Sequence, residues 1–590
     1  MAMEIKPLEE PLQNKILLEE TFYVLSKKSS TFKVRLTPKG LHLIKDTSDT
    51  VKEQLVLLKD IIGCQCLRSK RRTRNCTCQS LPRSDSLQVV EENSSELDDT
   101  DCSAYLYIYA YIFQGTSKKR ERTIITLRFR SFDKYEDNNK EAQRWRSAIK
   151  KLIKEPLNSA LLHESVLTTR HRETRRLLVL CNPKSGAGKG KQIFQQKVAP
   201  LLMEAEIPYD LHMTKCLNFA REFVRTSNLY QWTGIIAVGG DGIVFEIING
   251  LFERPDWSAI VKSLPIGVVP GGSGNGLARS IAHHSAEPYS PTPTLPATLA
   301  AIRGASVPMD LVRVETLSQI LFSFLSVGWG LLSDIDIESE RLRVLGGTRF
   351  TVWSVARLIG LRSYRGKLWY LPCPNPVTKR GEDEEEFGSP VNGGGSTLEL
   401  SGEVLLETEE GRPRVDSWYS AHSRRSDYFS TGGSSYQSTA DSGLGDGDGP
   451  RRMYGPAPTL PSLAAPLPDT WRCIEGRFVM VHASYQTHLG EECLMAPEAS
   501  PNDGRIWLLI VKHGASRSQM LQFMLGLTTG AHAASGNRDP TGNIELVPVS
   551  AFRIEPDMRQ QGYLTVDGEH VEYGPIQAEI FPELGRVMVP

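Results

Sequence analysis

The sequence contains no apolar run long enough to cross a bilayer. Its most apolar segment, residues 320–332, is shorter than the roughly 20 residues that a spanning helix needs. The chain also carries no net charge, since 69 Lys and Arg residues balance 69 Asp and Glu residues, so its composition gives no general attraction to nucleic acid. It has no signal peptide at its start and only ten cysteines in 590 residues, which favours a reducing compartment. We expect a cytoplasmic protein with peripheral membrane contact and no nucleic-acid partner.

A Walker-type phosphate loop is also missing, because G-x-x-x-x-G-K-[ST] does not occur,. Three other glycine-rich turns are present instead. Each lies between an apolar strand and a helical pattern, within RRLLVLCNPKSGAGKGKQIFQQ, GIIAVGGDGIVFEIINGL and LPIGVVPGGSGNGLARSIAHH. Three such turns in order predict a nucleotide site at one edge of a parallel sheet.

The second turn is the most informative. Ile235 to Val238 form a short buried strand, Gly239 and Gly240 end it, and Asp241 precedes a helix,. Asp241 is therefore predicted at the carboxyl end of a strand, where open α/β sheets bind ligands and where a helix terminus offers free N–H groups. The simpler alternative is a tight turn with an aspartate that caps its helix.

Short alternating strands fill the N-terminal region, in TFYVL, TFKVRL, GLHLI, QLVLL, AYLYIYAYIF and TIITLRFRSF. A helix follows, with Ala142, Trp145, Ile149 and Leu152 on one face,. This pattern resembles a pleckstrin-homology-type domain over residues 17–155. The resemblance implies either phosphoinositide binding or simple packing on the neighbouring domain.

Four cysteines in this region, Cys64, Cys66, Cys76 and Cys78, form two C-x-C pairs around a basic run. The spacing is tighter than that of usual zinc sites. A long solvated loop is favoured over a metal site, and a basic loop would also suit anionic lipid.

Residues 376–469 are rich in Gly, Ser, Pro and acidic residues, which predicts a disordered insertion. Its serines and arginines are candidate sites for regulatory kinases. After it, antiparallel strands and one helix at about residues 516–527 predict a β-sandwich.

The turns also carry a resemblance to a family. Asn182-Pro183-Lys184-Ser185-Gly186, Gly239-Gly240-Asp241-Gly242 and Pro270-Gly271-Gly272-Ser273-Gly274-Asn275 resemble the ordered motifs of the diacylglycerol-kinase-type lipid kinases. The downstream segments LSVGWGLLSDIDIESERLR, RSYRGKLWYLP, VPVSAFRIEP and LTVDGE are most similar to those of sphingosine kinases.

This resemblance implies an α/β + β fold. We expect a parallel-sheet α/β nucleotide domain at 172–312 and an antiparallel β-sandwich lipid domain at 313–375 and 470–590. The pleckstrin-homology-like β domain with its C-terminal helix precedes them.

The resemblance implies an ATP-dependent kinase that phosphorylates the primary hydroxyl of sphingosine-type long-chain bases to give sphingosine 1-phosphate, with Mg²⁺. Asp241 is the implied base, and Asp336 the implied reader of the substrate amine beside the glycine turn Gly239, Gly240, Asp241 and Gly242. Gly239 stands where the family often has Ser, which puts one substrate hydrogen bond in doubt. No metal ligand is assigned. The implied nucleotide contacts are Asn182, Pro183, Lys184, Thr214, Lys215, Cys216, Leu217, Asn218, Glu246, Gly272, Ser273, Gly274, Arg343, Arg349, Asp567, Gly568 and Glu569.

Two other functions are open. A ceramide kinase would also pair a pleckstrin-homology-type N-terminus with this module, but Asp336 favours a free amine over an amide. A catalytically dead lipid-binding scaffold would not need the intact GGDG and LTVDGE motifs. Asp334 is an alternative amine reader, since an extended segment would point Asp334 and Asp336 to one face.

Overall fold

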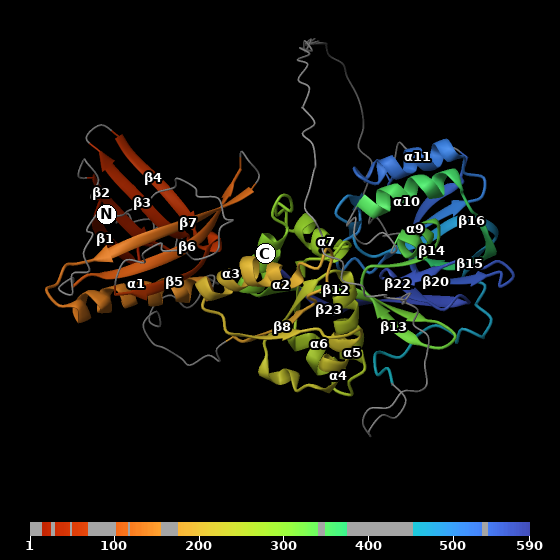
Figure 1. Cartoon of the computed structure of the whole chain (residues 1–590), viewed down its shortest axis with the longest axis horizontal. Coiled ribbons are helices and arrows are strands. Elements are labelled where there is room, and N and C mark those ends of the chain that lie inside the picture. Colours follow the sequence, from red (N-terminus) through yellow and green to blue (C-terminus); the bar gives the residue numbers. More distant parts are fainter. Residues whose placement is uncertain are drawn as a thin grey trace, which may run out of the picture. The chain divides into compact units, whose positions relative to one another are not determined.

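The computed structural model of the chain (Figure 1) describes residues 15–24, 30–47, 50–68, 102–115, 119–154, 175–339, 348–373, 452–533 and 541–590. The N-terminal region consists of two antiparallel sheets and one helix. The first sheet has β1 (Leu18–Val24), β2 (Ser30–Leu36), β3 (Gly40–Thr47) and β4 (Thr50–Leu57). The second has β5 (Ile61–Leu67), β6 (Ala104–Gln114) and β7 (Lys119–Phe129), and α1 is Tyr135–Lys154.

The core of this region follows from alternation along β6 and from the apolar face of α1. Leu106 and Ile108 of β6 pack with Trp145, which is 2% exposed and contacts Phe22 and Phe129. The four predicted inward residues of α1 are all buried, which confirms that helix face. Assignment to the pleckstrin-homology class stays a prediction. Cys64 and Cys66 were expected in a loop, but they lie on β5 because IIGCQCL pairs with β6.

The opposite face of β6 packs against the next region. Tyr105, Tyr107, Tyr109 and Tyr111 share an apolar cluster with strand and helix residues from 177–302. Beside this cluster, the Arg120 guanidinium donates to Asp60 at 2.8 Å and to Glu287 at 2.6 Å. The N-terminal domain and the α/β region therefore share a core as well as buried ion pairs.

Four parallel strands form the α/β region, in the order β11-β10-β8-β9. They are β8 (Leu177–Cys181), β9 (Tyr209–Met213), β10 (Ile235–Gly239) and β11 (Ile266–Pro270). Their helices are α2 (Gly190–Ile193), α3 (Ala199–Glu204), α4 (Phe219–Thr226), α5 (Asp241–Phe252), α6 (Trp257–Ser263), α7 (Gly276–His284) and α8 (Thr294–Arg303). The predicted strand–turn–helix units at all three glycine turns are confirmed.

The C-terminal half is mainly antiparallel, as predicted. Its strands are β12 (Ala305–Glu315), β13 (Ile320–Ser323), β14 (Ser326–Gly330), β15 (Tyr364–Pro372), β16 (Arg472–Ser484), β17 (His488–Gly490), β18 (Cys493–Leu494), β19 (Ile506–Lys512), β20 (Ile544–Pro556), β21 (Leu564–Val566), β22 (Glu569–Val571) and β23 (Ile576–Val589). Its helices are α9 (Leu331–Ser339), α10 (Thr348–Ile359) and α11 (Arg517–Gly526). The last of these confirms the helix predicted at about 516–527.

The two halves share one mixed sheet, which the expectation of a separate nucleotide sheet and sandwich did not include. The terminal strand β23 pairs antiparallel with β12 and β20, and its Val587 also pairs in parallel with Ile266 of β11. Strand pairing between residues this far apart in sequence leaves no local signal. On one face of this sheet, α9, α10 and α11 cover an apolar layer that includes Met480, Leu509 and Phe523 (Figure 1).

Residues 452–469 were expected to belong to the disordered insertion, but they make defined contacts. The buried Arg553 guanidinium donates to the carbonyls of Ala465 at 2.8 Å and Ser462 at 3.1 Å. The Tyr454 N–H donates to the Phe252 carbonyl at 2.8 Å. Backbone carbonyls satisfy a buried cation here, so this proline-rich segment is held although its composition resembles that of disordered chains. The predicted insertion at 376–451 lies outside the described residues. Among the helices described, none is both long and apolar enough to span a membrane.

Candidate functional site

The site is built around the turn that follows β10. Asp241 is the first residue of α5, as predicted, and extended Gly240 precedes it. The neighbouring turn approaches so closely that side chains do not fit. A Cβ on Gly240 would lie 2.9 Å from the Gly274 carbonyl oxygen, and one on Gly272 would lie 2.5 Å from the Gly240 Cα. The glycines are therefore required by contact between two turns.

The Asp241 carboxylate is buried and oriented by the start of α7. The Gly276 N–H donates to Oδ2 at 2.8 Å and the Leu277 N–H donates to Oδ1 at 3.3 Å. Burial raises the pKa of Asp241 to about 6, against the lowering effect of these two hydrogen bonds. An aspartate with this pKa is ionised at neutral pH and is a stronger base than an ordinary aspartate. Asp241 therefore caps α7, whereas the simpler alternative from the sequence was a cap of its own helix.

The first glycine turn joins the other two. A Cβ on Gly186 would meet the Gly271 carbonyl oxygen at 2.7 Å, and the Gly271 N–H donates to the Gly239 carbonyl at 2.8 Å. Asn182 accepts a hydrogen bond from the Lys184 N–H at 3.0 Å. The predicted nucleotide contacts of residues 182–184 and 272–274 thus lie at one sheet edge around the GGDG turn.

Glu246 holds the loop of residues 214–218. Its carboxylate accepts the N–H of Asn218 at 3.2 Å and of Ala220 at 2.9 Å, and burial raises its pKa. The Asn218 backbone is left-handed, with φ of 60°, and Leu217 is exposed. Glu246 therefore positions this loop at the N-terminus of α4, and its contact with the nucleotide stays a prediction.

The LTVDGE turn lies between the GGDG turn and α9. A Cβ on Gly242 would be 2.9 Å from Glu569 Oε1, and a Cβ on Gly568 would be 3.1 Å from Asp336 Oδ2. Glu569 therefore lies beside the GGDG turn, while Asp336 lies beside Gly568. The structure brings these predicted residues together although 233 positions separate Asp336 from Glu569 in the sequence.

Asp567 is used differently from its neighbours. Its Oδ1 accepts from the Ser323 hydroxyl at 2.6 Å and from the N–H groups of Leu325 and Ser326, both at 2.9 Å. Its Oδ2 accepts from the Phe324 N–H at 3.1 Å. Burial raises the pKa of Asp567 to about 6. With both oxygens engaged, this carboxylate holds the β13–β14 turn.

Asp334 and Asp336 lie on a helix, which corrects the expectation of an extended segment. Residues two apart on a helix are about 200° apart around its axis, so the two acids do not share a face. Asp334 is 1% exposed and accepts the Tyr364 hydroxyl at 2.6 Å, and burial raises its pKa to about 6. Asp336 is only partly buried. Of the two, Asp336 is therefore the more accessible to a ligand.

Several of the remaining predicted residues lie outside the part of the chain that the structure describes. Arg343 lies outside the described residues, and Arg349 lies in α10 with a side chain that is likewise outside them. Cys76 and Cys78 are outside them too. Burial raises the pKa of Cys64 to about 12, which disfavours the thiolate that zinc binds,. Within the part of the chain that the structure describes, no group of three or more His, Cys, Asp and Glu side chains could hold a metal ion.

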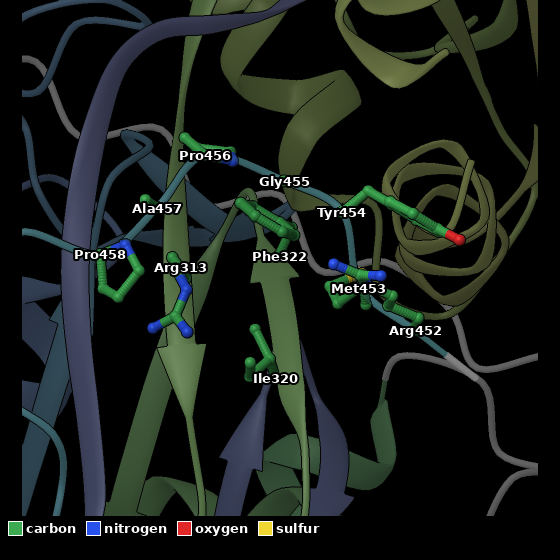
Figure 2. Close-up of a pocket in the computed structure, with 10 residues that line it drawn as sticks. All are labelled: Arg313, Ile320, Phe322, Arg452, Met453, Tyr454, Gly455, Pro456, Ala457 and Pro458. Atoms are coloured by element: carbon green, nitrogen blue, oxygen red, sulfur yellow. The ribbon is translucent and has the colours of Figure 1, made fainter. Parts of the chain in front are cut away.

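A cavity of about 260 Å³ lies elsewhere in the fold (Figure 2). Arg313, Ile320 and Phe322 line it together with residues 452–458. Ile320 and Phe322 belong to the most apolar segment of the chain, residues 320–332, but none of the predicted site residues contributes to this cavity.

Sequence reasoning missed the groups that orient Asp241. The N–H groups of Gly276 and Leu277 follow directly after the third glycine motif. Because β10 and β11 are neighbouring parallel strands, the turns after them meet at one edge,. That adjacency was the available signal.

Comparison with known proteins finds similarity over both halves of the chain. Residues 176–314 match the family model of the diacylglycerol kinase catalytic domain, and residues 469–589 match that of the YegS C-terminal NAD kinase beta sandwich-like domain. The chain is 33% identical to Sphingosine kinase 2 of Homo sapiens, covering 97% of this chain and 91% of that protein. It is 34% identical to Sphingosine kinase 1 of Homo sapiens, covering 69% of this chain and 89% of that protein. A putative diacylglycerol kinase from Bacillus anthracis str. Sterne is 16% identical with a TM-score of 0.42, covering 72% of this chain and 98% of that one.

Proposed function

This chain belongs to the sphingosine kinase family, with a diacylglycerol-kinase-type catalytic domain, and we propose that it transfers the γ-phosphoryl group of ATP to the primary hydroxyl of sphingosine. The product is sphingosine 1-phosphate. One observation carries this proposal. The basic carboxylate of Asp241 lies where three glycine turns meet, beside a fourth turn that reaches Asp336.

The glycine turns provide the nucleotide site. Gly240 and Gly272 have no side chains where the second and third turns approach each other, so the ATP phosphates can reach backbone N–H groups,. Exposed Lys184 adds a positive charge on the first turn. The loop of residues 214–218, fixed by Glu246, forms a further wall of the site.

The donor set suits a Mg²⁺ ion that is held jointly by the protein and by the phosphates of ATP. Mg²⁺ prefers oxygen ligands, keeps several waters and is usually held by one or two carboxylates together with substrate phosphates. Glu569, beside Gly242, is the carboxylate that would hold it, and Asp567 is already occupied by four donors. When bound, the ion would neutralise phosphate charge.

Asp241 acts as the base. Its carboxylate takes the proton of the acceptor hydroxyl, whose oxygen then forms the bond to the γ-phosphorus while the bond to ADP breaks. The N–H groups of Gly276 and Leu277 hold the carboxylate in place. A proton acceptor with a pKa of about 6 is well matched to neutral pH.

Asp336 binds the protonated amine of the long-chain base. An amine and a carboxylate form a charge-assisted hydrogen bond, whereas the neutral amide of ceramide gains no such charge. The alkyl chain would occupy the apolar layer between the sheet and α9–α11. The amine contact favours sphingosine over ceramide, and the intact base favours an enzyme over a scaffold.

Helices α10 and α11 pack against each other (Figure 1). Both helices expose apolar side chains, which supports the proposed membrane contact. Val355 and Ile359 are 56% and 70% exposed, and Leu521 and Leu525 are 48% and 65% exposed. An Ile359→Glu variant should bind anionic vesicles less strongly in a sedimentation assay, while soluble ATP binding is retained. Regulatory phosphorylation of the insertion and lipid binding by the N-terminal domain remain proposals from the sequence.

One assay tests the function. Purified full-length protein is given ATP with sphingosine, ceramide or diacylglycerol, and phosphorylated lipid is measured. We expect turnover with sphingosine and little with the other two, and Asp336→Asn should raise the KM for sphingosine far more than that for ATP. Asp334→Asn is the matched control, because Asp334 is buried against Tyr364. Preferred turnover of ceramide would refute the assignment of sphingosine as the substrate. If only Asp334→Asn raised the KM for sphingosine, Asp334 rather than Asp336 would bind the amine.

A further inference from the structure

Three polar side chains line the inner face of β16 and its continuation, where apolar residues would be expected. His482 is 5% exposed, and Ser484 and Gln486 are fully buried at 0%. The residues between them belong to the main apolar core on the other face of the sheet. At the preceding inward position, Met480 packs in the apolar layer under α9–α11. We call His482, Ser484 and Gln486 the polar stripe.

The polar stripe is unsatisfied. Among the described residues, eleven buried side-chain nitrogen and oxygen atoms have no hydrogen-bond partner, and five of them belong to these three side chains. They are both ring nitrogens of His482, the Ser484 hydroxyl and both amide atoms of Gln486. Buried polar groups normally have partners, because losing water without replacement is unfavourable. A concentration of orphaned atoms on one strand face indicates that something else binds there.

The stripe lies beneath α9. His482 pairs across the sheet with Gly328 of β14 and Leu509 of β19. A Cβ on Gly328 would be 3.0 Å from His482 Nδ1 and 2.7 Å from Ser333 Oγ of α9. Ser333 in turn bonds the Thr565 hydroxyl at 2.9 Å. The absence of a side chain at Gly328 therefore brings His482 close to α9.

The same face of α9 carries the proposed amine site. Asp336 follows Ser333 by three residues, so both lie on one helix face, about 4.5 Å apart along the axis. His488 follows two residues after Gln486, and its carbonyl oxygen would be 2.7 Å from a Cβ on Gly276. Gly276 begins the helix that holds the catalytic Asp241. The stripe therefore lies near the headgroup of the proposed substrate rather than near the end of its chain.

The chemistry of the stripe is neutral. Burial lowers the pKa of His482 to about 4, so its ring is uncharged at neutral pH and has one donor and one acceptor,. The Ser484 hydroxyl and the Gln486 amide also both donate and accept. Such a set complements a hydroxyl group, which donates and accepts, and does not suit an ion or a plain hydrocarbon.

We propose that the polar stripe recognises a hydroxyl on the substrate chain next to the amine-bearing headgroup. The favoured substrates would be long-chain bases with one hydroxyl more than sphinganine. This inference rests on the proposed function, whose substrate class it narrows.

The test compares two saturated bases that differ by this hydroxyl, 4-hydroxysphinganine and sphinganine, with the full-length protein. The wild-type kcat/KM should favour the hydroxylated base by about tenfold or more, because a site built to hydrogen-bond a hydroxyl rejects an analogue without it. His482→Leu and Ser484→Ala should each reduce this ratio towards one. His482→Gln, which keeps a donor and an acceptor, should retain more of the preference than His482→Leu.

Folding is checked separately. Replacing an unpartnered buried polar group with an apolar one should not lower the thermal unfolding temperature, and Ser484→Ala changes the volume little. Cys473→Ser, at an exposed position of the same strand, is the matched control and should leave the ratio unchanged. If the wild type treats both bases alike, or if the variants lose both substrates equally, the stripe does not read a hydroxyl although the kinase function stands. If neither base is phosphorylated, the proposed function itself fails.

Discussion

Replacing Asp567 with asparagine separates a structural role from a ligand role. The sequence motif suggests a carboxylate that returns to the nucleotide, whereas the structure shows four donors that occupy both of its oxygens. Asparagine keeps the size of the side chain. It also tolerates the left-handed backbone at this position, where φ is 52°,. The substitution therefore changes charge and hydrogen bonding with little backbone strain.

The expected magnitude follows from the division of the bonds. Three donors point to Oδ1 and one, the Phe324 N–H, points to Oδ2. The asparagine oxygen can replace Oδ1, and its NH₂ group then faces the Phe324 N–H, which loses its acceptor. One unsatisfied buried donor costs about 1–3 kcal/mol. Removing a buried charge offsets part of this, because the carboxylate itself is unfavourable there, as its raised pKa shows. Asp567→Asn should thus be destabilised by about 1–2 kcal/mol.

Asp567→Ala is the stronger perturbation. It removes the acceptor of all four donors at once, which at about 1–3 kcal/mol each reaches the scale of a whole domain's stability, about 5–15 kcal/mol. We expect this variant to unfold or to express poorly. The milder variant therefore carries the test.

The assay pairs thermal unfolding, followed by circular dichroism, with Mg·ATP affinity. Glu569→Gln is the matched control, because Glu569 belongs to the same turn as Asp567 but lies beside Gly242 of the GGDG turn. We expect Asp567→Asn to lower the unfolding temperature while its Mg·ATP affinity stays within about twofold of the wild type. Glu569→Gln should instead lower the Mg·ATP affinity and leave the unfolding temperature unchanged. An Asp567→Asn protein that unfolds like the wild type but binds Mg·ATP as poorly as Glu569→Gln would show that the carboxylate is a ligand after all.

Three further predictions concern the base, a buried acid and the insertion. Asp241→Asn should lower kcat by about 10²- to 10⁴-fold while ATP binding survives. The wild-type kcat/KM should fall as pH drops below about 6, because the protonated carboxyl of Asp241 cannot accept a proton,. Near-normal turnover of the variant would show that Asp241 is not the base. Burial raises the pKa of Asp334 in the folded state from 3.8 to about 6, so its contribution to stability is fully present below about pH 4 and is lost as pH rises to about 6,. The unfolding temperature of Asp334→Asn relative to the wild type should therefore rise between about pH 4 and pH 6.5, and a constant difference over this range would contradict the raised pKa. Predicted disorder over residues 376–469 implies that deleting residues 380–465 leaves catalysis intact. Because Arg553 binds the carbonyls of Ser462 and Ala465, we expect this only of a 380–451 deletion, with the 380–465 deletion less stable by circular dichroism. Equal stability of the two deletions would show that residues 452–465 contribute nothing.

Local chemistry made much of the nucleotide half predictable. Gly240 and Gly272 mark turns because no side chain fits where the two turns meet, and the apolar run of β10 followed by the apolar face of α5 fixes Asp241 between strand and helix. The pattern of β10, turn and α5 is encoded within about ten residues of Asp241. The position of Asp241 between strand and helix could therefore be predicted from the sequence, whereas its role as the base stays a proposal.

The lipid half was less predictable because its decisive contacts are remote in sequence. The alternation of Asp334, Ile335 and Asp336 imitates a strand, yet the segment is helical, since Leu331 and Ile335 lie one helical turn apart and pack together into the layer under α9–α11. Only the pairing of β23 with β11 reveals that both halves share a sheet. The separate roles of Asp334 and Asp336 follow from that tertiary packing.

The shared sheet explains how two parts of the chain that are distant in sequence can act on one lipid in the proposed reaction. Asp241 belongs to the nucleotide half and Asp336 to the lipid half, and the LTVDGE turn lies against both. Asp567 anchors this turn through four hydrogen bonds to the β13–β14 connection, and β21 pairs with β14 directly below it. In-line phosphoryl transfer requires the acceptor oxygen to be held within a fraction of an ångström, and a misplacement of about 1 Å can cost about 10²-fold in rate. In the proposed mechanism Asp567 touches neither substrate, but it can determine kcat by fixing the distance between Asp241 and Asp336, which are proposed to contact the lipid.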